Sequence, residues 1–206
     1  MGSNDPVTRL KILVFLLGCF PLLRLVILAI SGQLGANPVE FITHSTGTWT
    51  LVGLMLTLTV TPLRQLTGYT SLIRIRRMLG LFTFFYASLH FVTYIWLDQF
   101  FDLHAIVKDV YKRPFITVGF IAYLLLIPLA ITSSNIMIRR LGAKRWLSLH
   151  RIVYVIAILG VVHYWWLVKK DIRQPLIYAG VLTVLLGWRV VRWQRVRWQR
   201  ASLKPR

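Results

Sequence analysis

Long apolar runs, separated by short polar connections, dominate the sequence. A membrane-spanning helix needs about 20 mostly apolar residues, and the chain contains six segments that approach or reach this length. They cover residues 12–30, 46–61, 78–97, 115–132, 149–168 and 176–191. We therefore predict an all-α integral membrane protein, a six-transmembrane-helix bundle that forms a single domain over residues 1–206.

Glycine, proline or charged residues mark each connection, at residues 32–35, 62–64, 112–114, 139–142 and 169–171. Arg9 and Lys11 precede the first apolar run, as basic residues precede the apolar part of a signal peptide. The run is longer than that part usually is, and no small-residue cleavage pattern follows it. We expect it to be a retained helix.

Composition narrows the class of protein. The chain is 56% hydrophobic with a mean hydropathy of +0.64, which is atypical of a soluble or a disordered domain. Its single cysteine, Cys19, excludes a disulfide-stapled secreted module. The 25 basic residues against 6 acidic ones give a net charge of +19. Basic loops on a membrane protein or binding of nucleic acid could explain that charge.

The distribution of charge favours the membrane protein. With both termini cytoplasmic, the inside carries 18 basic residues and one acidic one, and the outside six basic and five acidic ones. This matches the positive-inside rule. Tryptophan and arginine alternate in the basic cytoplasmic tail, residues 192–206. Such a pattern occurs in nucleic-acid binders, but after a membrane helix it is typical of a segment lying on anionic headgroups. We expect contact with the lipid membrane and no nucleic acid.

Histidines inside a membrane point to function. His90 lies twelve residues into the third segment and His163 fourteen into the parallel fifth, so at about 1.5 Å per residue both lie about 20 Å above the inner surface. Imidazoles at one depth on two helices can supply both axial ligands of a low-spin haem. The alternative is that each simply bonds a neighbouring helix. The spans contain no carboxylate for a proton relay or for completing a zinc site.

Two further histidines are candidate ligands. His150 lies thirteen residues, or about 20 Å, before His163, a spacing that suits two stacked haems. The two side chains would point about 140° apart unless the helix is kinked or carries a π-bulge, for example near Gly160. His150 therefore lacks an obvious partner. His44, at the outer start of the second segment, could pair with His163 or orient a neighbouring helix.

Haem propionates need cationic or hydrogen-bonding partners. Arg24, well inside the first segment, could meet a propionate or extend to the headgroups. Arg77 and Arg151 could do the same near the inner surface, although the positive-inside rule alone accounts for arginines there. We predict no catalytic residue.

Several motifs resemble those of the ferric reductase-like transmembrane family. They are residues 76–81 leading to His90 and Tyr94, residues 139–142 with Trp146, residues 149–154, and the pair His163 and Tyr164. More narrowly, the chain is similar to the MsrQ family, and the likeness covers nearly the whole chain. The resemblance implies haem ligands at His90, His150 and His163, and one or two haem b groups. It also implies FMN, although no phosphate-binding glycine-rich loop is present.

The function that the resemblance implies is electron transfer in the bacterial cell inner membrane, for repair of methionine sulfoxide in oxidised periplasmic proteins. Electrons would come from the quinone pool or a cytosolic flavin reductase. They would pass to a periplasmic MsrP-like molybdopterin reductase, so that this chain is the electron-transfer subunit and its partner the catalytic one. Larger relatives carry two histidines on each of two helices and add cytosolic flavin and nicotinamide domains, and we expect this sequence to depart from them on both counts. A stand-alone transmembrane ferric or cupric reductase, and a cofactor-free transporter or scaffold, are the alternative functions.

Overall fold

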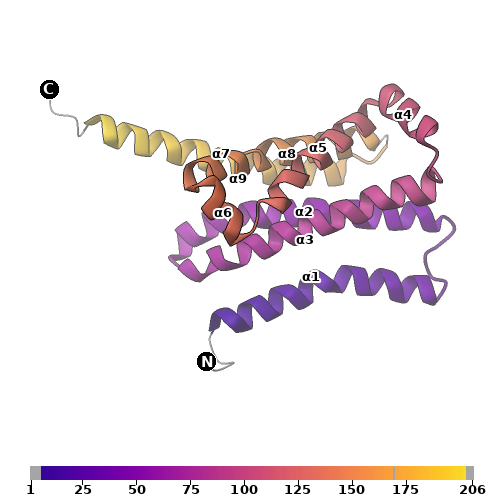
Figure 1. Cartoon of the computed structure of the whole chain (residues 1–206), viewed down its shortest axis with the longest axis horizontal. Coiled ribbons are helices and arrows are strands. Elements are labelled where there is room, and N and C mark those ends of the chain that lie inside the picture. Colours follow the sequence, from indigo (N-terminus) through magenta and orange to yellow (C-terminus); the bar gives the residue numbers. More distant parts are fainter. Residues whose placement is uncertain (1–5, 169, 203–206) are drawn as a thin grey trace.

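The computed structural model describes residues 6–168 and 170–202 (Figure 1). Asp5, Lys169, Lys204 and Arg206, which enter the charge count above, lie outside the described residues. The helices are α1 (Pro6–Ile30), α2 (Pro38–Thr67), α3 (Ile73–Thr93), α4 (Leu103–Lys112), α5 (Pro114–Ile131), α6 (Asn135–Leu141), α7 (Ala143–His150), α8 (Val153–Leu167) and α9 (Arg173–Ser202). A 3₁₀ turn, η1 (Thr70–Leu72), precedes α3, and a π-helical turn, η2 (Tyr94–Asp98), follows it.

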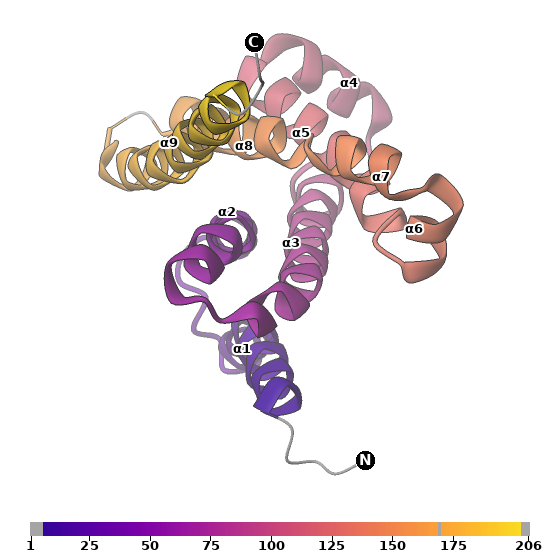
Figure 2. The same cartoon turned by 90° about the vertical axis from the view of Figure 1, so that its left-hand side faces the viewer.

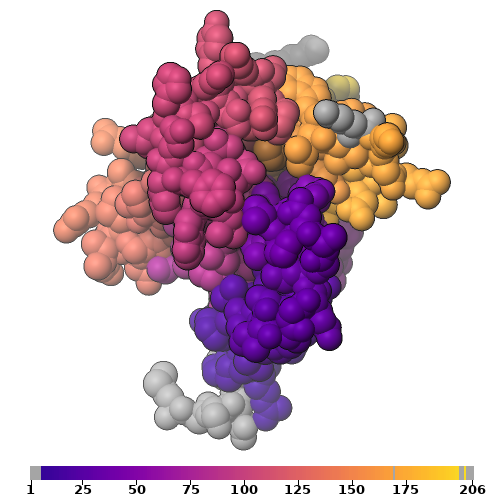
Figure 3. Space-filling view, turned by 90° about the vertical axis from the view of Figure 1, so that its right-hand side faces the viewer, coloured from indigo at the N-terminus to yellow at the C-terminus, as the bar shows by residue number. Residues whose placement is uncertain are grey.

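Six helical units are long and apolar enough to cross a membrane, and this confirms the predicted bundle. They are α1, α2, η1–α3–η2, α5, α7–α8 and α9. Both ends of the described chain lie at the same end of the bundle, which we call the terminal end (Figure 1). The opposite end, called here the distal end, carries α4 and the α1–α2 and α8–α9 connections. Figure 3 looks onto it, with α1 and α2 in indigo and purple beside α4 in pink.

The bundle consists of two closely packed pairs of helices, α2 with α3 and α5 with α8 (Figure 2). Leu54 and Leu58 of α2 and Ile156 and Ala157 of α8 are among the buried apolar residues that join the pairs in one core. Gly160 allows α8 to approach α2, since an added Cβ there would lie 3.1 Å from Leu51 Cδ2. Helix α9 packs against α2 and α8.

Helix α1 docks mainly on α3. The Tyr86 hydroxyl donates to Gly18 O at 2.7 Å and accepts from Leu22 N–H at 3.2 Å. Gly18 O and Leu22 N–H would normally bond to each other, four residues apart in the helix. The hydroxyl is inserted between them, next to Pro21, where the helix is already weakened. Gly18 also lets Phe82 approach, because a Cβ there would lie 2.6 Å from the Phe82 ring.

The predicted end of the second segment at Pro62 is wrong, since α2 continues through this proline to Thr67. Pro62 has no N–H, so Leu58 O loses its usual donor four residues on. The Arg189 guanidinium of α9 donates to that carbonyl instead. A side chain from a neighbouring helix thus satisfies the freed backbone group, as apolar surroundings require.

The fifth predicted segment is interrupted, but at Arg151–Ile152 rather than near Gly160. There α7 ends at His150, and Arg151 N and Ile152 N bond to Ser148 O and Leu149 O, three residues back. His104 lies in the short helix α4. Helix α9 continues into the basic tail as far as Ser202, with Arg197 over the Trp193 ring at 5.2 Å.

Candidate functional site

His90 and His163 lie next to each other near the distal end, as their matched depths predicted. His90 is three residues before the end of α3, and His163 is four residues before the end of α8. Their ring centroids are 6.1 Å apart and the ring planes are inclined at 77°. The pair therefore joins the two halves of the bundle, one imidazole from each.

A backbone carbonyl on a different helix fixes each ring. His90 Nδ1 lies 2.9 Å from Thr43 O of α2, and His163 Nδ1 lies 2.7 Å from Phe115 O of α5. A carbonyl oxygen only accepts, so each Nδ1 carries the proton and donates it. The Nε2 atoms of both neutral rings then keep a free lone pair. Carbonyl-anchored imidazole is the usual arrangement of histidines that bind a metal.

Glycine makes room for both rings. A Cβ at Gly47 of α2 would lie 3.1 Å from His90 Cε1. A Cβ at Gly119 of α5 would lie 2.7 Å from His163 Nδ1 and 2.8 Å from Cε1. Only a residue without a side chain fits at position 119 as the ring now lies, so α5 supplies both the space for His163 and its hydrogen-bond acceptor.

This donor set fits haem. His90 and His163 each keep an Nε2 lone pair and their ring centroids are 6.1 Å apart, so both imidazoles could hold one haem iron. The hydrogen bond that holds each Nδ1, and the glycine that leaves room for each ring, also suit a pair of metal-binding histidines.

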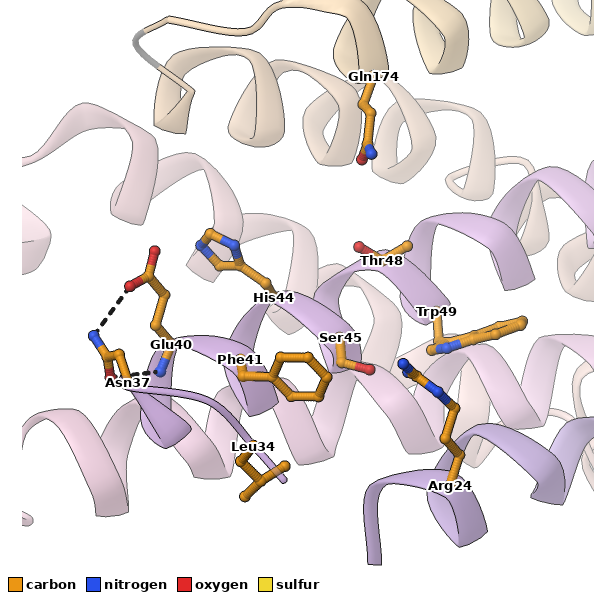
Figure 4. Close-up of a pocket in the computed structure, with 10 residues that line it drawn as sticks. All are labelled: Arg24, Leu34, Asn37, Glu40, Phe41, His44, Ser45, Thr48, Trp49 and Gln174. Carbon is orange, nitrogen blue, oxygen red and sulfur yellow. Dashed lines mark hydrogen bonds between the residues drawn. The ribbon is translucent and has the colours of Figure 1, made fainter. Parts of the chain in front are cut away.

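His44 and Arg24 belong to a neighbouring pocket of about 530 Å³ at the distal end (Figure 4). The Arg24 guanidinium lies 5.7 Å from the centroid of the Phe41 ring. Asn37 Nδ2 donates to Glu40 Oε2 at 3.0 Å on the same wall. His44 therefore lines this polar pocket and does not lie between His90 and His163. The residue before it, Thr43, supplies the carbonyl that holds His90.

The remaining candidates lie toward the terminal end. His150 Nδ1 donates to Trp146 O at 3.1 Å, and the Trp146 ring stacks on the imidazole at 3.9 Å. His150 Nε2 is buried and has no hydrogen-bond partner among the described residues. Arg77 donates to Asn135 Oδ1 at 3.1 Å, so it is directed toward α6. Arg151 is exposed.

The groups that orient the histidines were not predicted from the sequence. Thr43 and Phe115 act through their carbonyls, which no side-chain pattern shows. Gly47 and Gly119 could have been noticed, because an isolated glycine within an apolar helix often marks a close approach.

Comparison with known proteins places the chain in a family. Residues 46–161 match the family described as "Ferric reductase like transmembrane component". The chain is 56% identical over 190 residues to a protein of Herminiimonas arsenicoxydans, covering 91% of this chain and 87% of that one. That relative is named "Protein-methionine-sulfoxide reductase heme-binding subunit MsrQ". This chain belongs to the MsrQ family.

Two further MsrQ proteins are similar over most of their length. The one from Ralstonia nicotianae is 59% identical over 182 residues, 87% of this chain and 84% of the relative. The one from Azospira oryzae is 57% identical over 186 residues, 90% and 80% respectively. With six apolar spans and membership of a transmembrane family, the chain is a multi-pass membrane protein.

Proposed function

We propose that this MsrQ-family chain is a haem b electron-transfer subunit of a methionine sulfoxide reductase system. The observation that carries the proposal is the pair His90 and His163, with both Nδ1 atoms anchored on carbonyls and ring centroids 6.1 Å apart. The heme-binding names of the relatives support it. Bound between these rings, haem accepts and donates single electrons.

The residues of the chain position and insulate that haem. Thr43 O and Phe115 O hold each imidazole in the tautomer that leaves Nε2 free. If haem is bound, His90 and His163 would hold its iron and the surrounding apolar helices would exclude water from it, so that the group would supply one-electron transfer. The protein therefore relays electrons, and its partner carries out the chemistry on methionine sulfoxide.

The position of the pair is consistent with delivery of electrons to the outer face. With the terminal end cytoplasmic, as the positive-inside rule requires, the distal end faces the periplasm of a bacterial inner membrane. His90 is four residues from the start of η2 and close to that face. Electrons enter from the quinone pool or a cytosolic flavin reductase, with FMN as a further carrier, and leave to a periplasmic MsrP-like molybdopterin enzyme.

One observation favours a second function, reduction of ferric or cupric ions at the distal surface. The family is ferric reductase-like. The carboxylates of Asp98 and Asp102 lie at the distal end, in exposed positions from which they would attract cations.

An absorption spectrum of the purified protein tests the haem. Dithionite should produce the sharp α-band of a b-type cytochrome, and its absence would refute the proposal. His90→Ala and His163→Ala should each remove most of the low-spin signal. His104→Ala, a substitution at an exposed position of α4, should retain it.

Coupled turnover separates the two functions. Vesicles containing the reduced protein are mixed either with a periplasmic molybdoenzyme and methionine sulfoxide or with ferric citrate. Reoxidation of haem that requires the molybdoenzyme supports the proposed function. Equally fast reoxidation by ferric citrate alone supports metal reduction instead.

A further inference from the structure

Helix α4 lies outside the six spans and carries an exposed apolar stripe. It is at the distal end and lies across the long axis of the bundle (Figures 1 and 2). Leu103, Val107 and Tyr111 follow one another at every fourth position, and their side chains are 76%, 69% and 89% exposed. Residues four apart lie on one face of a helix. Helix α4 therefore presents a continuous apolar surface that no described part of the chain covers.

A second stripe of α4, beside the first, is basic. His104, Lys108 and Lys112 each follow an apolar residue by one position and so lie about 100° further around the helix. All three side chains are exposed. The acidic residue of α4, Asp109, pairs with Arg113 at 3.3 Å. The exposed side of α4 is thus apolar along one edge and cationic along the other.

The contacts of Asp109 show which way the apolar stripe faces. Its carboxylate accepts hydrogen bonds from the Tyr94 hydroxyl at 3.5 Å and from Gln99 Nε2 at 3.3 Å, so this side of α4 faces η2. Val107 is two positions before Asp109 and therefore lies about 160° around the helix from it. The apolar stripe points away from η2, out of the bundle.

The packing of α4 on α5 shows which way the basic stripe faces. The large apolar side chains of α4 that are half-buried are Ile106 and Val110. Lys108 is two positions from each of them, and so lies about 160° around the helix from both. The basic stripe therefore points away from α5, the helix that continues into the membrane.

The length of α5 fixes the level of α4. Helix α5 begins at Pro114 and has 18 residues, a rise of about 27 Å, which barely spans a hydrocarbon core of about 30 Å. Its first turn must therefore lie at the boundary between acyl chains and headgroups. The Thr117 hydroxyl in that turn donates to Val110 O. The last turn of α4 consequently lies at the same boundary.

We propose that α4 is an interfacial helix that holds the distal end of the protein on the lipid surface. Its apolar stripe enters the leaflet beside the bundle, and its basic stripe lies against the phosphates of the headgroups. Burial of apolar side chains drives such binding, and lysines next to them are attracted by anionic lipids. Orientation, level and charge all match this occupant. The proposal does not depend on haem.

The turn before α4 fits the same placement. Phe100 and Phe101 have left-handed φ angles of 48° and 61°, which are unfavourable for residues with large side chains. Both rings are largely exposed. Aromatic side chains gather at the interface between membrane and water. Burial of the two rings there would offset the cost of the backbone conformation.

Spin labels on single-cysteine variants test the placement. Cys19→Ser removes the native thiol, and Val107→Cys or Lys108→Cys then allows one label on the apolar or on the basic stripe. Each full-length variant is reconstituted into nanodiscs of phosphatidylcholine and phosphatidylglycerol. Electron paramagnetic resonance measures how often the label collides with oxygen, which concentrates among acyl chains, and with a water-soluble nickel chelate.

The label at position 107 should collide mainly with oxygen and lie about 5–10 Å inside the boundary of the headgroups. The label at position 108 should collide mainly with nickel. Leu103→Cys and Tyr111→Cys should repeat the first result, and His104→Cys the second, because the two stripes alternate with the helical period. Circular dichroism checks that the helices of each labelled variant are intact.

Equal exposure of positions 107 and 108 to nickel would overturn the proposal, and would leave the apolar stripe free for a soluble partner protein. Low collision with both reagents at position 107 would overturn it as well, since protein rather than lipid then covers the stripe. Spin–spin broadening in that sample would identify the covering protein as a second copy. Haem binding is measured separately by absorption, so failure of this proposal is distinct from failure of the proposed function.

Discussion

Gly119→Ala tests whether the space beside His163 is part of the haem site. The new Cβ would lie 2.7 Å from His163 Nδ1 and 2.8 Å from Cε1, against an ordinary contact distance of about 3.5 Å. The ring must retreat by roughly 1 Å, because the Cβ is fixed to the backbone of α5. That movement stretches or breaks the 2.7 Å bond from His163 Nδ1–H to Phe115 O.

The expected loss follows from the role of that bond. Removing the group that orients a metal-binding histidine typically costs 10–100-fold in affinity, or about 1.4–2.7 kcal/mol. Apo-protein is titrated with hemin while the Soret and α-bands are followed, and low-spin content is measured by electron paramagnetic resonance. We expect affinity about 10–100-fold weaker and a diminished low-spin signal.

Gly80→Ala is the matched control, since a Cβ at this helical position of α3 meets nothing within 4 Å. It should bind haem like wild type and gain up to about 1 kcal/mol of helix stability. The reasoning is refuted if Gly119→Ala shows wild-type affinity and an unchanged low-spin signal. Circular dichroism of both variants checks that the helices are intact.

Two further substitutions test how the helices are held together. Tyr86→Phe removes the hydroxyl that bridges Gly18 and Leu22. It should lower the free energy of unfolding in mixed micelles by about 1 kcal/mol. The control Tyr111→Phe, at a side chain that is 89% exposed, should leave that free energy unchanged. Equal stability of the two variants would contradict the bridging role. Arg189→Leu leaves Leu58 O without a donor and should cost about 1–3 kcal/mol. Adding Pro62→Ala restores a backbone N–H and should recover much of the loss; no recovery would refute this account.

The spans could be predicted from the sequence because lipid leaves few alternatives to a long apolar helix. Their ends were less predictable. Proline at position 62 suggested a helix end, since its missing N–H normally leaves a carbonyl unsatisfied. Only the packed structure shows that Arg189, 127 positions later in the chain, supplies the donor.

The histidine pair was predictable for a similar reason, because depth in a membrane depends only on rise per residue. The direction in which a side chain points around its helix could not be predicted. Arg76 and Arg77 are neighbours in sequence but point about 100° apart, and the rotation of α3 against α2 and α8 decides which of them faces the interior. The structure places Arg77 against Asn135 and leaves the Arg76 side chain half-buried.

The division of the bundle into two pairs has a consequence for how the protein matures. His90 is tied to α2 within one pair, and His163 to α5 within the other, so an iron held by both imidazoles would cross-link the halves. A ligand that binds only the assembled form stabilises it by about 4 kcal/mol when its free concentration is 1,000 times Kd. If the proposed haem binding holds, the unloaded chain would unfold more readily than the loaded one and would be the better substrate for a protease.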